Sequence, residues 1–532
     1  MELLLNICIY LPLAGIIGIL LVRSSQAVKW ISLLVTTATF VLSLPLLLNF
    51  EIGSSAVQYM TAGDPVLPGL DIKYLVGLDG LSLLLFMLTT LIGPIVILAS
   101  WNSVEKHLAG YYSMLLLLQT ASLGVFASLD LIVFYIFFEL SLIPMYFLIG
   151  IWGGKGRIHA TVKFFVYTLV GSLIMLVGLI YLGYDAGAFM EGVTFTSDWR
   201  FLSGESYQIG LVEQTWLFLA FALAFCIKVP LFPFHTWLPY AHTEAPTAGS
   251  VVLAAIMLKM GTYGLLRVCL PVFPNAFMEF APYMAALAVI GIIYGALVAM
   301  VQKDWKKLVA YSSVSHLGFV VLGLFAFNTI AVQGALIQMV NHGLSTGALF
   351  LIVGMIYDRR HTREIKDFGG IAKVMPVFAT VFMITTLASI GLPGLNGFVG
   401  EFLILNGTFN SAIIPEKAFA IFGTVGVILA AVYMLWLYQR VMFGPLKHEE
   451  NKQLTDLNFR EIGLLVPLII FMFWIGIRPT DFMKYSETQI DEMLQASEQK
   501  SVAIRQAASS KELPEWATTL YDVTPELASE MK

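Results

Sequence analysis

Charged residues are scarce in this sequence. Only 12% of its 532 residues are Asp, Glu, Lys or Arg, whereas 58% are hydrophobic; an ordinary soluble chain carries about twice that charged share. Apolar runs of about 20 residues recur, and each is long enough to cross a hydrocarbon layer roughly 30 Å thick. The composition therefore predicts a membrane protein with many crossings. No basic block points to a nucleic acid as partner.

Cysteine is scarce as well. Cys8, Cys226 and Cys269 are the only three, and all lie in apolar segments. Their spacing matches no metal motif and offers no disulfide framework, so we interpret them as small buried side chains. The first apolar run starts almost at Met1 without a basic leader or a small-residue cleavage site, which predicts a retained helix rather than a signal peptide.

Fourteen apolar segments are predicted to span the membrane, and the expected fold is an all-α polytopic bundle. By residue number they are 3–22, 28–49, 80–100, 110–127, 130–150, 163–183, 213–235, 248–270, 280–301, 307–326, 332–356, 374–408, 417–440 and 461–478. The twelfth is too long for one crossing and contains GLPGLNG, so we expect a broken helix with Pro393 and Gly394 at the break. The seventh is expected to break at Pro230 and Pro233.

The basic residues of the loops separate onto two sides. One side receives only Lys73, Arg200 and Lys417, and the other receives eighteen. The eighteen are Arg23, Lys29, Lys106, Lys155, Arg157, Lys163, Lys303, Lys306, Lys307, Arg359, Arg360, Arg363, Lys366, Lys373, Arg440, Lys447, Lys452 and Arg460. The positive-inside rule places the eighteen in the cytoplasm. Both termini are then expected outside.

An internal repeat is visible in the spacing of the segments. Lys228 lies beside one break and Glu401 beside the other, and the neighbouring segments are related by the same offset in residue number. Five helices per copy is an odd number, so the second copy should enter the membrane from the opposite face, as in many transporters. We expect a three-helix flank at 1–108, copies at 109–270 and 279–444, a loop and last helix at 445–478, and a polar exterior tail at 479–532. Chance spacing among similar helices is the alternative.

Six ionisable residues interrupt the apolar segments, and such residues are functional-site candidates by default. They are Glu139, Lys228, Lys259, His316, His342 and Glu401. Four of them lie about 9–11 residues into their segments, roughly 14–17 Å at 1.5 Å per residue. Glu139 and Lys228 suit a direct ion pair. All six can hold and release a proton, so the row predicts proton transfer parallel to the membrane plane.

Each of these residues also has a plainer interpretation. A lone histidine on a helix is often only a hydrogen-bonded core residue, Lys259 could reach an interface, and Glu139 could be neutral and merely packed. His235 and His242 lie among prolines, where a structural or relay role is favoured over a metal site. The breaks could be kinks for packing. However, broken helices also expose backbone groups that lipid cannot satisfy, which favours internal water.

Several motifs together resemble one protein family. KVPLFPFHTWLPYAHTEAPT, AAIMLKMGTYGLLR, FFELSLIPMYFLIG, KKLVAYSSVSHLGF and GLPGLNGFVGEF are similar to those of the antiporter-like subunits of respiratory complex I and of multisubunit cation/proton antiporters. The resemblance covers about residues 75–445. Glu401 stands where most other members carry Lys, which narrows the resemblance to one branch of the complex I subunits.

The resemblance implies a function. Glu139 and Lys228 match the family's Glu–Lys pair, Lys259 its central lysine, His316 and His342 its relay positions, and Glu401 the end of its proton path. The implied partners are neighbouring antiporter-like chains in a bacterial plasma membrane. The chain itself should hold no cofactor or metal, because flavin, iron–sulfur clusters and quinone sites belong to other subunits of the family's complexes.

Three alternatives stay open. A cation/proton antiporter subunit would share the fold. A b-type haem carrier could use His316 and His342 as axial ligands, but this leaves the buried lysines unexplained. A purely structural scaffold is disfavoured by the cost of burying charge.

Overall fold

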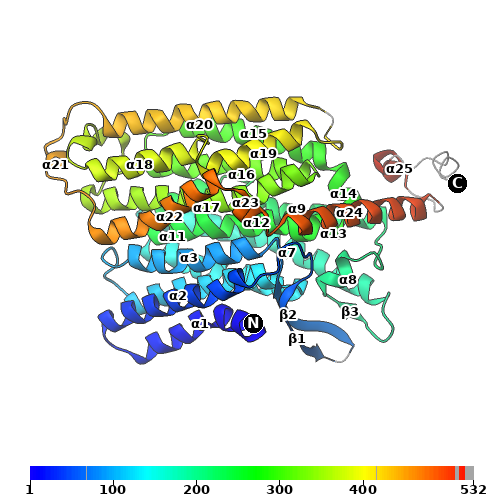
Figure 1. The fold of residues 1–532 in the computed structure, drawn as a ribbon. Coiled ribbons are helices and arrows are strands. Elements are labelled where there is room, and N and C mark those ends of the chain that lie inside the picture. The colour runs from blue at the N-terminus through cyan, green and yellow to red at the C-terminus, as the bar shows by residue number, and fades with distance from the viewer. Residues whose placement is uncertain (68, 415, 510–513, 522–532) are drawn as a thin grey trace.

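Long helices lie side by side through the whole molecule and form one bundle (Figure 1). The computed structural model describes residues 1–67, 69–414, 416–509 and 514–521. Within these ranges, twelve helices are long and apolar enough to cross a membrane, and two shorter apolar helices, Leu83–Ala99 and Pro376–Ser389, accompany them. A mostly helical multi-pass membrane protein is therefore confirmed. The total of fourteen crossings stays a prediction.

The elements follow the expected order. The N-terminal flank contains α1 (Glu2–Leu21), α2 (Ser25–Leu48), β1 (Gln58–Leu67), β2 (Leu70–Leu78) and α3 (Leu83–Ala99). The next stretch contains α4 (Leu108–Ala127), α5 (Leu131–Leu140), α6 (Leu142–Trp152), α7 (Arg157–Gly187), β3 (Phe195–Thr196), α8 (Trp199–Ser203), α9 (Leu211–Lys228), α10 (Leu238–Glu244), α11 (Thr247–Val252), the π-helix η1 (Leu253–Met257), α12 (Leu258–Gly264), the π-helix η2 (Leu265–Cys269) and α13 (Leu270–Val272).

The second half has a similar sequence of helices. It contains α14 (Pro274–Glu279), α15 (Ala281–Met300), α16 (Trp305–Phe325), α17 (Thr329–Arg360), the short 3-10 turns η3 (Ile365–Asp367) and η4 (Ile371–Lys373), α18 (Pro376–Ser389), α19 (Asn396–Phe409) and α20 (Ala418–Met442). The chain ends with α21 (Glu449–Lys452), α22 (Phe459–Ile477), α23 (Thr480–Met483), α24 (Glu487–Ala508) and α25 (Glu515–Tyr521).

Several helix bounds in the two halves differ by the same number of residues that separates Lys228 from Glu401, as the spacing of the segments predicts. Added to both bounds of α4, this offset gives the two bounds of α15. Added to the last residue of α7, it gives the last residue of α17. The two copies and their inverted relation remain a prediction, which this agreement supports.

Both predicted helix breaks are present. α9 ends at Lys228, before the predicted end of the segment at 235. The helix stops early because Pro230 and Pro233 have no backbone N–H and cannot continue it; both follow cis peptide bonds. Turns then lead to α10 at Leu238.

The second break separates α18 from α19. Gly391 and Gly394 stand between them with φ of +75° and +92°, a left-handed conformation that only glycine adopts without strain. Pro393 lies between these glycines. The turn lies at the surface of the bundle, where Leu392, Pro393 and Gly394 are exposed.

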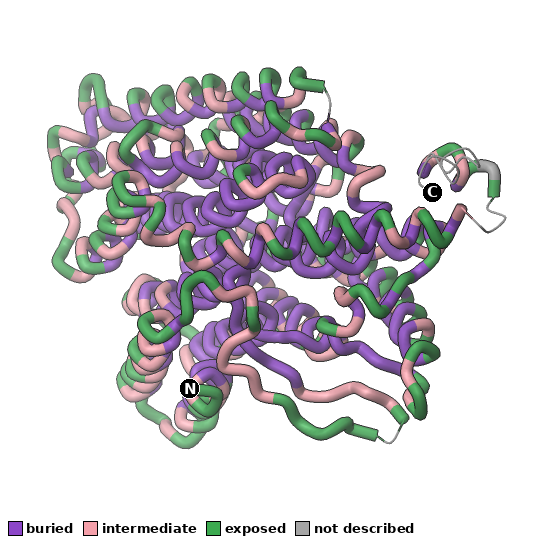
Figure 2. Tube along the Cα trace, turned by 45° about the vertical axis from the view of Figure 1, so that its right-hand side comes forward, coloured by how far each residue is buried: buried purple, intermediate pink, exposed green. Residues whose placement is uncertain are grey.

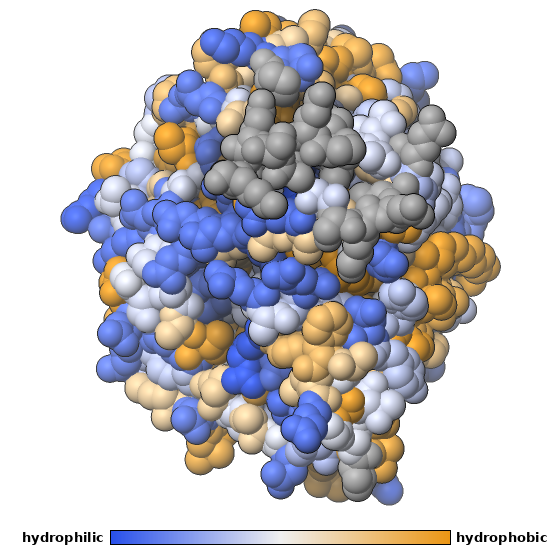
Figure 3. All heavy atoms as spheres, turned by 90° about the vertical axis from the view of Figure 1, so that its right-hand side faces the viewer, coloured by the Kyte–Doolittle hydropathy of each residue, from blue (hydrophilic) through white to orange (hydrophobic). Residues whose placement is uncertain are grey.

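A three-stranded sheet at one end of the bundle was not predicted. β1 and β2 pair antiparallel, and β2 pairs with the short β3 in parallel. Asn6 near the start of α1 is hydrogen-bonded to Thr61 and Tyr74 of the hairpin, so the N-terminus lies beside it (Figure 1). We call this the hairpin end and the opposite one the basic end. Figure 3 looks onto the hairpin end, where hydrophilic side chains cross the middle of the face.

The predicted exterior tail is partly a helix that packs on the hairpin end. α24 buries an apolar stripe while its other face stays exposed (Figure 2). Its contacts reach both halves of the chain: Lys500 donates to the carbonyl of Leu202 in the first, and Ser501 and Asp491 accept from Asn275 and Thr329 in the second. Residues 510–513 and 522–532 of the predicted tail lie outside the described ranges.

Lys500 of α24 is buried without a counter-ion. Its amine donates to the carbonyl oxygens of Leu202 at 2.8 Å and Pro271 at 3.4 Å. In the described part of the chain, no carboxylate oxygen lies within 4 Å of it. Burial lowers the pKa of Lys500 to about 7, because desolvation disfavours the charged amine.

Attachment of α24 should consequently depend on pH. Between pH 7 and pH 10.5 the docked helix carries a neutral Lys500 while a released helix carries a proton. Attachment therefore strengthens as the pH rises through this window, by up to about 1.4 kcal/mol per pH unit, and is weakest below pH 7. Hydrogen exchange of the α24 amides, corrected for the intrinsic rate at each pH, measures this. Lys500→Met should remove the dependence, and an unchanged slope in that variant would refute the assignment.

Candidate functional site

Lys259 lies at the centre of the bundle. The span Thr247–Val272 that carries it and the long helix α17 each contain an 18-residue window that is buried throughout. π-helical turns flank α12 on both sides, and such turns displace the regular backbone hydrogen bonds. The amine of Lys259 donates to the carbonyl of Ala254 in the first of these turns. Its second contact is Nδ1 of His342 on α17, at 2.6 Å.

Three more predicted residues continue from this contact. The rings of His342 and His316 have centroids 5.9 Å apart. Nδ1 of His316 lies 2.9 Å from Oε1 of Glu401 on α19. The structure thus brings together Lys259, His342, His316 and Glu401 in one buried chain that crosses from α12 through α17 and α16 to α19.

Polar side chains that the sequence analysis did not consider complete the second half of this chain. Gln338 donates to Oε1 of Glu401 at 3.2 Å, and Asn341 donates to Oε1 of Gln338 at 3.3 Å. Asn341 and Asn396 each donate to the other's backbone carbonyl, which ties α17 to the start of α19. Their Oδ1 atoms and Oε2 of Glu401 are buried without a protein partner. Such groups are places for ordered water.

Two other polar groups close the site around His316. The hydroxyl of Tyr433 lies 3.4 Å and that of Ser389 3.5 Å from Nε2 of His316. Both lie in apolar segments, where an uncharged hydroxyl gives a weaker signal than a charge. Only ionisable residues were predicted for the site, so these two hydroxyl groups were missed. Polar residues one or four positions from His342, such as Asn341 and Gln338, would have been the signal to follow.

The predicted ion pair between Glu139 and Lys228 is not formed. Across the described residues no ion pair within 4 Å joins them. Lys228 instead donates to the hydroxyl of Ser141 at 3.1 Å and lies 4.5 Å from the ring centre of Phe138. Ser141 stands where α5 gives way to α6, so its hydroxyl is presented to the amine in place of the Glu139 carboxylate. One carboxylate oxygen of Glu139 is buried without a partner, which leaves it able to accept a proton.

His235 and His242 lie in the stretch that follows the break after α9, His242 within α10. His242 is fully buried, stacks on Phe350 with ring centroids 4.4 Å apart, and has no hydrogen-bond partner at either ring nitrogen. His235 packs against Phe232 and Tyr294. In the ranges that the structure describes, no three His, Cys, Asp or Glu side chains come together as metal ligands.

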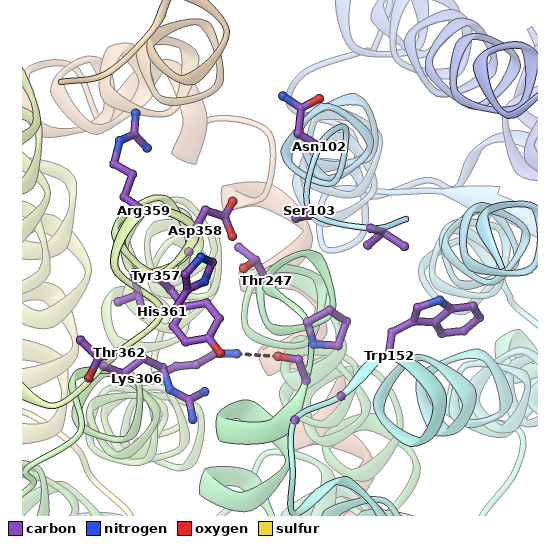
Figure 4. Close-up of a pocket in the computed structure, with 18 of the residues that line it drawn as sticks. Asn102, Ser103, Trp152, Thr247, Lys306, Tyr357, Asp358, Arg359, His361 and Thr362 are labelled. Atoms are coloured by element: carbon purple, nitrogen blue, oxygen red, sulfur yellow. Dashed lines mark hydrogen bonds between the residues drawn. The ribbon is translucent and has the colours of Figure 1, made fainter. Parts of the chain in front are cut away.

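A cavity of about 1060 Å³ opens at the basic end (Figure 4). Cations and carboxylates share its lining: Lys155, Lys306, Arg359, Arg363, Arg460, Glu244, Asp358 and Glu461. Lys306 lies at its inner side, where its amine donates to the carbonyl of Ala245 at 2.6 Å. The guanidinium of Arg359 binds both oxygens of Glu461 at 2.6 Å, which joins α17 to α22 beside the cavity. Water can therefore approach the buried row from this end.

This geometry suits the movement of protons rather than bond chemistry. Lys259 with His342 and His316 with Glu401 form hydrogen-bonded pairs that can exchange a proton, and the centroids of the two imidazole rings lie 5.9 Å apart. Desolvation raises the free energy of an unpaired charge at each position. No single position therefore holds an extra proton strongly, and the proton passes to the next group.

Comparison with known proteins agrees with this site. Residues 128–430 match the family model described as "NADH:quinone oxidoreductase/Mrp antiporter, TM". A relative from Rhodobacter capsulatus, NADH-quinone oxidoreductase subunit M, is 45% identical over 492 residues, covering 90% of this chain and 94% of the relative.

Solved structures share the fold. One chain of respiratory complex I from Thermus thermophilus with bound NADH matches with a TM-score of 0.82 and 31% identity, over 93% of this chain and 99% of that one. A chain of the Mrp complex from Dietzia sp. matches with a TM-score of 0.79 at 18% identity, over 93% of this chain and 99% of that one, which shows the fold alone. Together these matches establish that the chain belongs to the antiporter-like transmembrane family of NADH:quinone oxidoreductases and Mrp antiporters, within the branch of NADH-quinone oxidoreductase subunit M.

Proposed function

We propose that this chain is a proton-translocating membrane-arm subunit of an NADH-quinone oxidoreductase. The observation that carries the proposal is the unbroken series of buried contacts from Lys259 to Glu401. Its relatives bear the name of that enzyme, which moves electrons from NADH to quinone. Protons move through this chain, and their movement is driven by quinone reduction in partner subunits.

Transfer along the row follows from the atoms that face one another. Lys259 hands a proton to Nδ1 of His342, whose Nε2 is buried without a protein partner. One water bridges from there to Nε2 of His316. The opposite nitrogen, Nδ1, passes the proton to Oε1 of Glu401. In one passage each imidazole accepts on one nitrogen and releases from the other, and its tautomer has to be reset before the next proton.

Uptake begins in the cavity at the basic end. Lys306 at its inner side and the partner-free nitrogens of His242 stand between the cavity and Lys259. His242 can accept a proton from the cavity on one nitrogen and release it inward from the other. Release follows at Glu401, whose Oε2 faces the break at Gly391.

Glu139 and Lys228 control the row electrostatically. In this structure the amine of Lys228 is held by Ser141 and the face of Phe138, away from Glu139. A charge change in a neighbouring subunit that draws the amine toward Glu139 removes positive charge from the vicinity of Lys259. Lys259 then holds its proton more strongly, and the reverse movement expels it.

The proposal assigns partners and orientation as well. Neighbouring antiporter-like chains form the membrane arm, and flavin, iron–sulfur clusters and quinone belong to other subunits. The hairpin end faces the exterior of a bacterial plasma membrane, since basic residues gather at the other end. Both termini then lie outside.

Removing the central lysine should uncouple electron transfer from pumping. In the assembled complex, Lys259→Ala and Glu139→Gln should each lower proton translocation by about 10²-fold or more, because the first removes a proton carrier and the second removes the carboxylate that controls it. Proton release per NADH oxidised, measured with a pH dye in sealed vesicles, tests this. Lys259→Arg should fail to restore pumping, because a guanidinium keeps its proton.

The matched control is Lys447→Ala, which removes an exposed lysine at the basic end. Its proton yield should equal that of the wild type. A full proton yield in assembled Lys259→Ala complex would contradict the proposed function. Sodium-driven proton movement without NADH oxidation would instead favour a cation/proton antiporter.

The two histidines near the basic end should differ in their effect. His242→Phe keeps the stacking on Phe350 but removes both ring nitrogens, so turnover should fall by about 10²-fold. His235→Phe changes the same side-chain type off the path and should stay near wild-type rates. NADH-driven proton uptake in oriented vesicles separates them. Equal rates for the two variants would exclude His242 from the path.

A further inference from the structure

A buried ion pair outside the row includes one residue of the transmembrane segment that carries Lys259. Arg267 in η2 contacts Oδ2 of Asp79, which lies in the turn ahead of α3. Asp79 is fully buried and Arg267 is 2% exposed. The other carboxylate oxygen of Asp79 accepts from the backbone N–H groups of Leu81 and Ser82 at 3.1 and 3.2 Å. Burying two charges at this depth costs free energy even when they are paired, so the pair points to a role beyond packing.

Aromatic rings enclose the guanidinium of Arg267. The Trp199 ring lies 4.1 Å from its central carbon, and the indole N–H donates to the backbone carbonyl of Arg267 at 2.7 Å. Trp199 comes from α8 at the hairpin end, so it covers the guanidinium from that side. Tyr263, one turn nearer to Lys259, lies 5.8 Å away, and its hydroxyl donates to the carbonyl of Phe126.

Two donors of Arg267 remain unused by the protein. Nε and Nη2 are buried and have no hydrogen-bond partner within the described residues. Buried donors of this kind are satisfied by water. A line of water from Lys259 past Arg267 to the hairpin end would give a proton on Lys259 a second way out of the bundle.

Arg267 lies on the hairpin side of Lys259. Arg267 follows Lys259 by about two helical turns on the segment Thr247–Val272, which places it roughly 12 Å nearer to the hairpin end. A guanidinium stays protonated and repels any excess proton that approaches through water. An arginine in a narrow water path excludes protons and cations in the same way in some channels.

We propose that Arg267 is an electrostatic barrier that closes the hairpin end of the bundle beneath Lys259. Asp79 and Trp199 hold the guanidinium across the path. A proton on Lys259 is then forced sideways through His342 and His316 to Glu401, where the partner-free Oε2 and the helix break offer a way out. The inference rests on the proposed function and adds the reason why protons travel along the row.

A purely structural role makes a different prediction. If the pair only ties the start of α3 to the central helix, removing either partner leaves the other charge unpaired, and both losses should be similarly harmful. If the cation is the barrier, the two substitutions differ. Asp79→Asn keeps an oxygen for the N–H groups of Leu81 and Ser82 and keeps the cation, whereas Arg267→Gln removes the cation.

The test uses the assembled complex in sealed vesicles without NADH. An imposed pH gradient is allowed to decay, and the passive proton permeability is measured with an internal dye. Arg267→Gln should raise permeability by about tenfold, which corresponds to about 1.4 kcal/mol, while Asp79→Asn should stay close to wild type. A tight Arg267→Gln vesicle, or equal leaks in both variants, would overturn the barrier.

A double variant covers the case in which Arg267→Gln does not assemble. Asp79→Asn with Arg267→Gln leaves a neutral pair and no unpaired buried charge. The barrier predicts that this variant leaks, and a structural tie predicts that it is tight. Lys259→Ala in the same vesicles separates the two proposals: a full NADH-driven proton yield there contradicts the proposed function, whereas a tight double variant contradicts the barrier alone.

Discussion

The hydrogen bond between the amine of Lys259 and Nδ1 of His342 joins the two halves of the molecule at their centre. Lys259 belongs to the segment that closes the first predicted copy, and His342 to the third long helix of the second. Each group would be costly to bury alone. Their contact allows both to stay inside a bundle that excludes bulk water, and the other polar groups of the site are arranged around it.

Irregular backbone supports this contact. Lys259 sits between two π-helical turns, Lys228 ends a helix ahead of two prolines, and Glu401 follows a glycine-rich break. In each case a backbone interruption lies within a few residues of an ionisable side chain. Interrupted helices leave backbone groups that only protein or water can satisfy, so the same positions attract the water that a proton path needs.

The spans, the two breaks and the row of ionisable residues could be predicted, because each stands out against an apolar background. The ion pair of Glu139 with Lys228 is open in this structure: spacing along the chain does not reveal that Ser141, at the α5–α6 junction, lies against the amine. Gln338 and Asn341 were overlooked because they are uncharged. The hairpin was not predicted, because only apolar runs of membrane-spanning length were taken as elements. The π-helical turns were not predicted, because a single sequence carries no signal for them.

The helix α24 lies across the hairpin end and is fastened to both halves, to Leu202 in the first and to Asn275 and Thr329 in the second. Transporters built from inverted repeats usually work by rocking one repeat against the other. A brace fixed to both sides resists such rocking at this face. Proton movement in such a braced bundle relies on side chains and water that shift within it, not on rocking of one half against the other.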